Sequence, residues 1–62
     1  MDERSACPVC GCEINQDDVD VASGTEYGGW LHVPHVCPDC GRSLVAYFDA
    51  ESGYVFSHFE TA

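Results

Sequence analysis

A five-residue motif occurs twice in this chain and restricts its folding more than any other feature. Residues 7–11 read CPVCG, and residues 37–41 read CPDCG. Two residues between cysteines allow one tight turn to direct both sulfur atoms at a single point, and a second such turn completes a tetrahedron. The spacing therefore predicts one metal site with four cysteine ligands, which are Cys7, Cys10, Cys37 and Cys40.

The residues around these cysteines predict the same local structure in both motifs. Pro8 and Pro38 fix the backbone angle φ directly after the first cysteine. Gly11 and Gly41 follow the second cysteine, where the chain must bend back and a positive φ is expected. We therefore expect two similar turns, each a cysteine knuckle whose backbone N–H groups point at the thiolates.

The length of the chain predicts that something besides its hydrophobic core must stabilise it. A chain of 62 residues buries too little apolar surface to fold comfortably without a disulfide, a metal or a partner. Five cysteines are an odd number, which argues against a fully paired disulfide framework and favours a compartment that keeps thiols reduced. We expect a single domain over residues 7–62, preceded by a flexible N-terminus at residues 1–6.

Two further features of the sequence bear on location. No basic stretch followed by an apolar one opens the chain, so no secretory signal is recognised. The longest apolar run, LVAYF at residues 44–48, is far too short to cross a membrane. We therefore expect a cytoplasmic protein with no membrane partner.

The charge of the chain is strongly one-sided. Eleven acids stand against two arginines, Arg4 and Arg42, and no lysine, which gives a formal net charge of −9. Four thiolates and one dication would bring it to about −11. Such a surface repels nucleic acid and anionic lipid, except in molar salt, where the screening length falls to roughly 3 Å. The composition resembles that of proteins from salt-accumulating archaea, and the alternative is a small acidic protein from a mesophile.

Three segments have the residue content of β-strands. They are residues 30–36, 43–49 and 53–60, which are rich in β-branched and aromatic residues. The last two are joined by a turn-forming stretch and predict a β-hairpin. Pro34 confines the first segment to an edge or to the end of a strand ladder. Earlier in the chain, the pattern predicts only one short strand near residues 18–22.

The expected hairpin leads to a prediction about binding. With Phe48 opposite Tyr54, Ala46 lies opposite Phe56, and both faces of the sheet are substantially apolar. The rest of the chain is too short to cover both faces, so one is expected to stay partly bare and to bind a protein partner or a second copy. The side chains of this face would be Val45, Tyr47, Val55 and Phe59. The alternative is that they are scattered surface hydrophobes.

The paired motifs, together with length and acidity, resemble the small CPxCG-type zinc-finger proteins of haloarchaea. This resemblance implies a small, metal-stabilised β fold of the zinc-ribbon kind, with two cysteine knuckles, a C-terminal β-hairpin and one structural zinc ion. It also implies a regulatory or interaction role. Zinc ribbons also serve in nucleic-acid machinery, where rings such as Trp30 and Tyr47 could stack on bases. The absence of lysine favours a protein partner instead.

A second family competes for the same cysteines. Residues 35–41, HVCPDCG, resemble the second knuckle of rubredoxins, which would imply iron and electron transfer. This chain departs from that pattern at Cys12, where rubredoxins usually have an aromatic residue, and in the hairpin that follows the second knuckle. A tetrahedral site of four sulfurs suits either metal.

The remaining cysteine and two histidines complete the set of candidate residues. Cys12 is expected to be a half-buried, small apolar residue beside the metal. The alternatives are that it replaces Cys10 as a ligand or acts as a redox-sensing thiol. His32 and His35 should point to opposite faces of a strand, with His32 a candidate to shield the thiolates. Because four cysteines close the metal shell, no catalytic role is expected.

Overall fold

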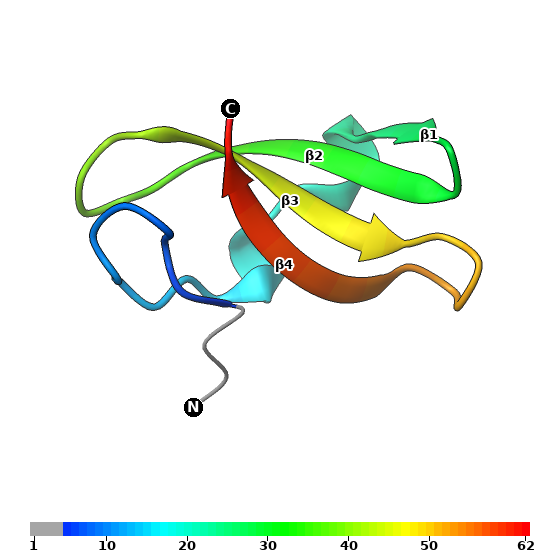
Figure 1. Cartoon of the computed structure of the whole chain (residues 1–62), viewed down its shortest axis with the longest axis horizontal. Coiled ribbons are helices and arrows are strands. Elements are labelled where there is room, and N and C mark those ends of the chain that lie inside the picture. The colour runs from blue at the N-terminus through cyan, green and yellow to red at the C-terminus, as the bar shows by residue number, and fades with distance from the viewer. Residues whose placement is uncertain (1–4) are drawn as a thin grey trace.

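A four-stranded antiparallel sheet, in the order β1-β2-β3-β4, forms the body of the molecule (Figure 1). The computed structural model describes residues 5–62. The strands are β1 (Thr25–Tyr27), β2 (Trp30–Val36), β3 (Ser43–Asp49) and β4 (Val55–Thr61). The small β fold predicted from the sequence is confirmed, and two of its three predicted strands keep their predicted bounds.

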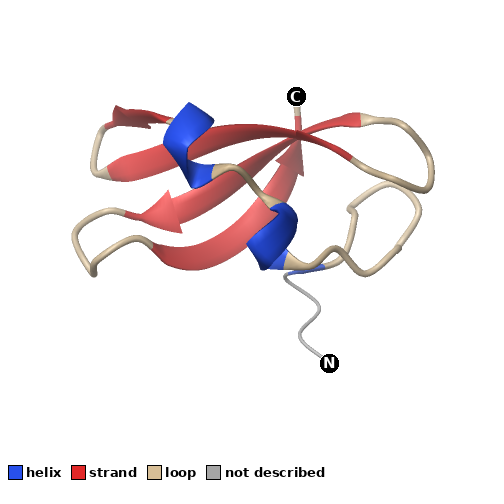
Figure 2. Cartoon of the chain, turned by 180° about the vertical axis from the view of Figure 1, so that it is seen from behind, coloured by secondary structure: helices blue, strands red, loops and turns tan. Residues whose placement is uncertain are grey.

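The segment before the sheet forms two short 3-10 turns that lie across one face of the sheet (Figure 2). They are η2 (Gln16–Asp18) and η3 (Val21–Ser23). The strand predicted near residues 18–22 is therefore wrong. Within the part of the chain that the structure describes, no helix is long and apolar enough to cross a lipid bilayer.

Side-chain capping explains why this segment turns instead of extending. The Oδ1 atom of Asn15 accepts a hydrogen bond from the backbone N–H of Asp17 at 3.0 Å. The Oδ1 atom of Asp20 accepts in the same way from Ala22 at 3.2 Å. Asparagine and aspartate compete for nearby backbone donors in this manner and so favour turns over strands.

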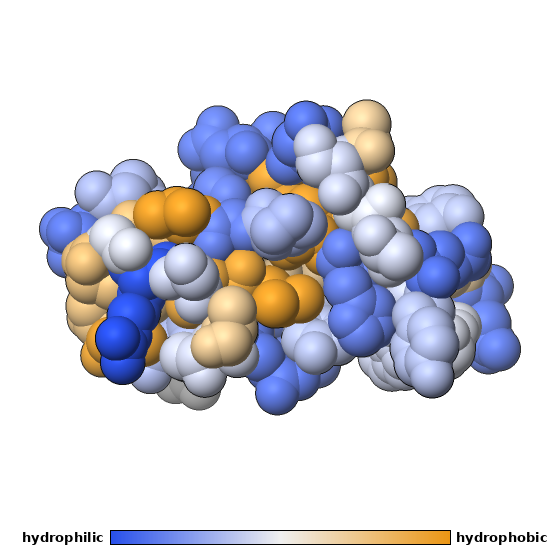
Figure 3. Space-filling view, turned by 90° about the horizontal axis from the view of Figure 1, so that it is seen from above, coloured by the Kyte–Doolittle hydropathy of each residue, from blue (hydrophilic) through white to orange (hydrophobic). Residues whose placement is uncertain are grey.

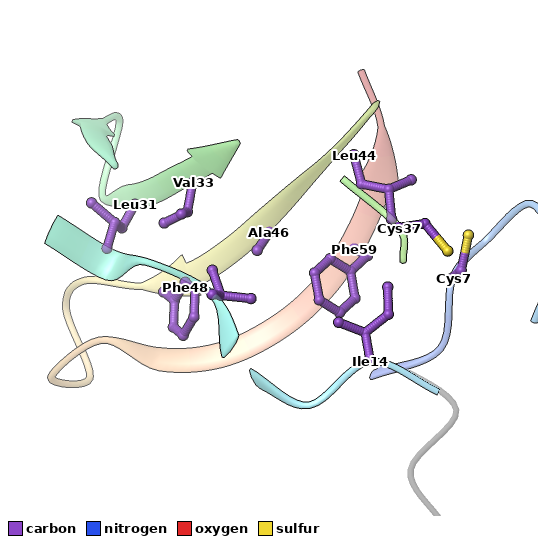
Figure 4. Packing of buried hydrophobic residues seen from close by; sticks show 10 residues of the cluster. Cys7, Ile14, Leu31, Val33, Cys37, Leu44, Ala46, Phe48 and Phe59 are labelled. Atoms are coloured by element: carbon purple, nitrogen blue, oxygen red, sulfur yellow. The ribbon is translucent and has the colours of Figure 1, made fainter. Parts of the chain in front are cut away.

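The core lies between this segment and the inner face of the sheet (Figure 4). Val33 and Ala46, at the centre of β2 and β3, are completely buried. Burying each large aliphatic or aromatic side chain contributes roughly 1.5–3 kcal/mol, so a core this small gives limited stability. Its members are Cys7, Ile14, Val19, Leu31, Val33, Cys37, Leu44, Ala46, Phe48 and Phe59.

The hairpin of β3 and β4 forms in a different register from the predicted one. Phe48 pairs with Phe56 instead of Tyr54. The reason is that Gly53 and Tyr54 both adopt positive φ angles, +88° and +62°, which keep them in the turn. Strand β4 therefore begins only at Val55.

A β-bulge between Tyr47 and Phe48 shifts the register once more. Beyond it, Ala46 pairs with Phe59 and Tyr47 pairs with His58. Because side chains alternate along a strand, this shift exchanges the two faces. The placement of Phe59 on the bare face is thus wrong, since its side chain is 6% exposed and belongs to the core.

The opposite, outer face of the sheet is not covered by any described segment (Figures 1 and 2). The register places Val45, Tyr47 and Val55 on this face, since Val45 pairs with Glu60 and Val55 with Asp49. The side chain of Val55 is 56% exposed. Viewed from above, hydrophobic residues gather over the knuckle end and the middle of the molecule, while the other end is largely hydrophilic (Figure 3).

Pro34 lies on an interior strand, but at a position that tolerates proline. Strand β2 pairs with β3 along its whole length, and Pro34 is opposite Val45. On its other side β2 pairs with β1 only as far as His32. Pro34 is therefore past the end of that ladder, in agreement with the prediction.

Two described residues, Ser5 and Ala6, belong to the segment predicted to be a flexible N-terminus. Residues 1–4 of that segment are outside the described part of the chain. Ala6 forms an isolated antiparallel bridge with Glu13, and the N–H of Ile14 donates to the carbonyl oxygen of Ser5 at 2.9 Å. Ser5 and Ala6 are thus hydrogen-bonded to the residues that follow the first knuckle.

Candidate metal site

The first cysteine knuckle, residues 7–12, is a tight turn closed by backbone hydrogen bonds. The N–H of Cys7 donates to the carbonyl oxygen of Cys12 at 2.7 Å, and the N–H of Gly11 donates to that of Cys7 at 2.9 Å. The N–H of Val9 reaches the Sγ atom of Cys7 at 3.4 Å. Gly11 has the expected positive φ, +76°.

The second knuckle, residues 37–42, repeats this geometry. The N–H of Cys37 donates to the carbonyl oxygen of Arg42 at 3.0 Å, and the N–H of Gly41 donates to that of Cys37 at 2.9 Å. The φ angle of Gly41 is +73°. A Cβ atom added at this glycine would meet nothing within 4 Å, so glycine is required for its backbone conformation and not for space.

The two knuckles bring their four sulfur atoms together. The Sγ atoms of Cys7 and Cys40 are 3.8 Å apart, and those of Cys10 and Cys37 are 3.7 Å apart. All four sulfurs lie within 4.8 Å of one another. A tetrahedron with metal–sulfur bonds of about 2.3 Å has edges of about 3.8 Å, which the distances between Cys7 and Cys40 and between Cys10 and Cys37 match. The same distances are far too long for disulfide bonds, and all four cysteines are free.

The cluster joins the core on one side and faces solvent on the other. The first cysteine of each knuckle is buried, with Cys7 2% exposed and Cys37 1% exposed. Their sulfurs point toward each other beside Leu44 (Figure 4). Cys10 and Cys40 are exposed. A metal ion held here would therefore stabilise the end of the core while keeping two of its sulfurs accessible.

Backbone N–H groups favour negative charge on one buried sulfur. The N–H of Cys40 is the largest influence on the Cys37 thiol, and the N–H of Asp39 acts in the same direction. Despite the opposing effect of burial, they lower the pKa of Cys37 from its ordinary value to about 6. This direction agrees with the expectation that knuckle N–H groups stabilise thiolates.

The two exposed sulfurs hold their protons more tightly. The N–H of Cys12 lowers the pKa of Cys10, but desolvation and hydrogen bonds with the other thiols raise it to about 12. The N–H of Arg42 has the corresponding effect on Cys40, whose pKa is nonetheless raised by desolvation and by Cys37. A metal ion must therefore displace protons from Cys10 and Cys40 when it binds.

These two donors were not singled out in the sequence analysis. The N–H groups of Cys12 and Arg42 come from the residue that directly follows the glycine of each motif. Their equivalent positions in the repeat are the signal that could have identified them. The repeat thus extends one residue beyond the five letters that are visibly alike.

Comparison with protein-family models, with curated proteins and with solved structures finds no match to this chain. The candidate metal site is therefore supported by its own geometry. Four cysteine thiols from two equivalent turns converge on one point, at distances that suit a tetrahedral metal ion.

Cys12 is adjacent to this cluster but not part of it. Its side chain is half-buried and packs against the core, and its thiol donates to the carbonyl oxygen of Glu13 at 3.5 Å. Burial raises the pKa of the Cys12 thiol, followed by the charges of Asp39 and Cys37. This placement agrees with the predicted half-buried apolar role and does not make Cys12 a ligand in place of Cys10.

The two histidines of β2 point to opposite faces, as predicted. The ring of His35 lies on the inner face, 6.0 Å from that of Phe59. The ring of His32 lies on the outer face, 4.6 Å from that of Tyr47. The suggestion that His32 shields the thiolates is therefore wrong, because the cysteine core and His32 are on different faces of the sheet.

Proposed function

We propose that this protein is a small zinc-binding interaction module. In this proposal Cys7, Cys10, Cys37 and Cys40 bind one structural zinc ion, and the sheet that the ion stabilises binds another protein. The observation that carries the proposal is the set of sulfur distances, 3.7 Å and 3.8 Å, that match the edges of a zinc–thiolate tetrahedron.

A structural role for the ion follows from the ligand set. A catalytic zinc ion has three protein ligands and one open position, whereas four thiolates fill its shell. Enzymatic activity is therefore not part of the proposal. The acidic, lysine-free surface favours a protein partner over nucleic acid, and the free cysteines favour a cytoplasmic location.

Zinc is favoured over iron because of the chain beyond the second knuckle. Residues 43–61 form a complete β-hairpin of β3 and β4, as the resemblance to zinc ribbons implies. A rubredoxin-like iron site for electron transfer is the second candidate. The exposure of Cys10 and Cys40 supports it, since electrons could leave through these sulfurs.

Metal analysis and native mass spectrometry of the purified protein test the metal. We expect one zinc ion per chain, none in Cys37→Ser, and one in the matched control Cys12→Ser. A metal-free wild-type protein that is folded would overturn the proposal. A red protein that contains iron would replace it with the second candidate.

A capture experiment in molar potassium chloride tests the interaction role. The wild-type protein is expected to retain a partner that the zinc-free Cys37→Ser variant does not. Because the halophilic origin is also part of the proposal, the melting temperature of the zinc-loaded protein should rise between low and molar salt, where carboxylate repulsion is screened. A melting temperature indifferent to salt would contradict that origin.

A further inference from the structure

A row of aromatic rings crosses the outer face of the sheet. His32, Tyr47 and His58 are cross-strand neighbours on β2, β3 and β4. The ring of Tyr47 lies 4.6 Å from that of His32 and is stacked on that of His58 at 5.0 Å, with an angle of 12° between the planes. Tyr27 and Trp30 add edge-on contacts, each 6.4 Å from the nearest ring of the row. None of these rings belongs to the hydrophobic core.

These rings surround an open hollow of about 360 Å³. Its main lining residues are Tyr27, Trp30, His32, Tyr47, His58 and Glu60. Two of these lining residues are open to solvent, since Tyr27 is 78% exposed and Trp30 is 38% exposed. By contrast, Phe48 and Phe59 are buried in the core. The sheet therefore presents aromatic surface to solvent at this hollow.

One carboxylate lies at the rim of this hollow. The Oε2 atom of Glu60 is 2.9 Å from the Nε2 atom of His58, and the Glu60 side chain is 56% exposed. The one lysine or arginine among the described residues, Arg42, is in the second knuckle and does not line the hollow. The aromatic rings therefore offer π faces and Glu60 offers negative charge, and no lysine or arginine of the described residues lies beside them.

We propose that this hollow binds an arginine side chain from a basic segment of a protein partner. A guanidinium group stacks on aromatic faces and pairs with a carboxylate, which are the two groups present here. The proposal rests on the interaction role proposed above and specifies the chemistry of the partner. The net charge of −9 would attract a basic segment and repel the phosphates of nucleic acid. A second copy of this chain is less suited, because it carries the same charge and only two arginines.

The fluorescence of Trp30, the only tryptophan, provides a direct readout of the hollow. The zinc-loaded protein is titrated with a short glycine–serine peptide that carries two arginines. A matched peptide carries citrulline, which has the shape of arginine without its charge. We expect saturable change in Trp30 emission with the arginine peptide and none with the citrulline peptide at the same concentrations.

Two variants and one control locate the binding. Glu60→Gln removes the rim carboxylate, Tyr27→Leu removes an exposed ring, and Asp18→Asn removes the same unit of charge from η2 on the opposite side of the sheet. We expect the first two to weaken arginine binding about twofold to fivefold, as for an exposed cation–π or ion pair, and the control to change it by less than about 1.5-fold. Thermal melts check that all three proteins keep the wild-type fold.

Several outcomes would overturn the inference. Equal binding of the citrulline peptide would exclude recognition of a cation, and equal weakening by Asp18→Asn would indicate only general charge attraction. Concentration-dependent Trp30 emission together with a dimer in light scattering would make a second copy the occupant. A shift with an oligonucleotide but not with the arginine peptide would make the occupant nucleic acid.

Failure of the inference can be distinguished from failure of the proposed function. The zinc content of the protein is measured before the titration. A protein that contains no zinc contradicts the proposed function, whereas the arginine site is judged on the titration of zinc-loaded protein. If zinc is present and a partner is captured equally by wild type, Glu60→Gln and Tyr27→Leu, the interaction role stands and the arginine site does not.

Discussion

The two cysteine knuckles are nearly identical in local geometry but differ in how the rest of the molecule holds them. Both are closed by equivalent backbone hydrogen bonds, and the φ angles of Gly11 and Gly41 differ by only a few degrees. The second knuckle connects β2 and β3, which pair over their full length. The first is flanked instead by the isolated bridge between Ala6 and Glu13 and by the hydrogen bond from the N–H of Ile14 to the carbonyl oxygen of Ser5. Nearly equal sequences thus form equivalent turns, but only the second turn connects two paired strands of the sheet.

This difference indicates what a metal ion bound between the knuckles would do for the fold. The first knuckle leads directly into the segment that covers the inner face, where Ile14 and Val19 are buried. In both sulfur contacts, at 3.8 Å and 3.7 Å, one cysteine comes from each knuckle: Cys7 with Cys40, and Cys10 with Cys37. In the proposed function, a metal ion shared by these pairs would fix the covering segment to the sheet and so stabilise this small core.

The largest effect is expected from removing one cysteine ligand from either knuckle. Cys7→Ser and Cys37→Ser should each abolish cooperative thermal unfolding, followed by circular dichroism. The reason is that zinc contributes on the order of 10–16 kcal/mol in zinc-finger peptides, which matches or exceeds the usual stability of a domain, about 5–15 kcal/mol. Cys12→Ser is the matched control and should melt cooperatively. Retained cooperative melting in either ligand variant would show that the knuckles do not depend on a shared ion.

The second prediction concerns the attachment of the covering segment. Ile14→Ala should destabilise the zinc-loaded protein by about 2–5 kcal/mol, because Ile14 is only 2% exposed and packs in the core next to the first knuckle. Val21→Ala, a change in the same segment at a residue 42% exposed, should cost less than about 0.5 kcal/mol. Denaturant unfolding measures both. Similar losses for the two variants would mean that the segment is not held through Ile14.

A third prediction uses the unequal proton affinities of the sulfurs. Above pH about 6, Cys37 is already a thiolate, whereas Cys10 and Cys40 have raised pKa values and must each release a proton to bind zinc. Protons then compete with the metal, so zinc affinity should rise at least about 100-fold per pH unit in this range, about tenfold for each of these two protons.

Below pH about 6, Cys37 also takes up a proton and the dependence should become steeper. Competition with a chelator of known affinity, repeated at several values between about pH 5 and pH 8, measures how zinc affinity changes with pH. An affinity independent of pH would contradict the assignment of protonated thiols at Cys10 and Cys40.

The smallest expected effects come from the two knuckle glycines. Gly11→Ala and Gly41→Ala force an L-residue to keep a positive φ, which costs roughly 1–2 kcal/mol. Neither added Cβ atom meets another atom within 4 Å, so the two losses should be equal. Thermal melts of the zinc-loaded variants provide the values. A clear difference between them would mean that the knuckles are not equivalent when the metal is bound.

The parts of this structure that depend on local sequence could be predicted from it. The knuckles form because proline and glycine fix the backbone within five residues, and the four cysteines were identified from that spacing alone. Strands β2 and β3 were also predicted with correct bounds, since their β-branched and aromatic residues are continuous. Each of these predictions needs no knowledge of which segments pair.

The parts that depend on pairing could not be predicted in the same way. Nothing in the sequence around Tyr54 signals that a tyrosine will adopt a positive φ, and the bulge after Tyr47 has no distinctive residue. Together they moved Phe59 into the core and His58 onto the outer face. Strand β1 was missed because three exposed residues, Thr25–Tyr27, have no hydrophobic pattern until β2 pairs with them.

The central claim is that one metal ion joins the two knuckles and thereby holds the covering segment on the sheet. The most direct test is a two-dimensional amide NMR spectrum of the isotope-labelled, zinc-loaded protein before and after addition of a strong chelator. We expect the dispersed signals to collapse on chelation, including those of Cys7, Gly11 and Ile14, and to return when zinc is restored. An unchanged, well-dispersed spectrum in the chelated protein would contradict the claim.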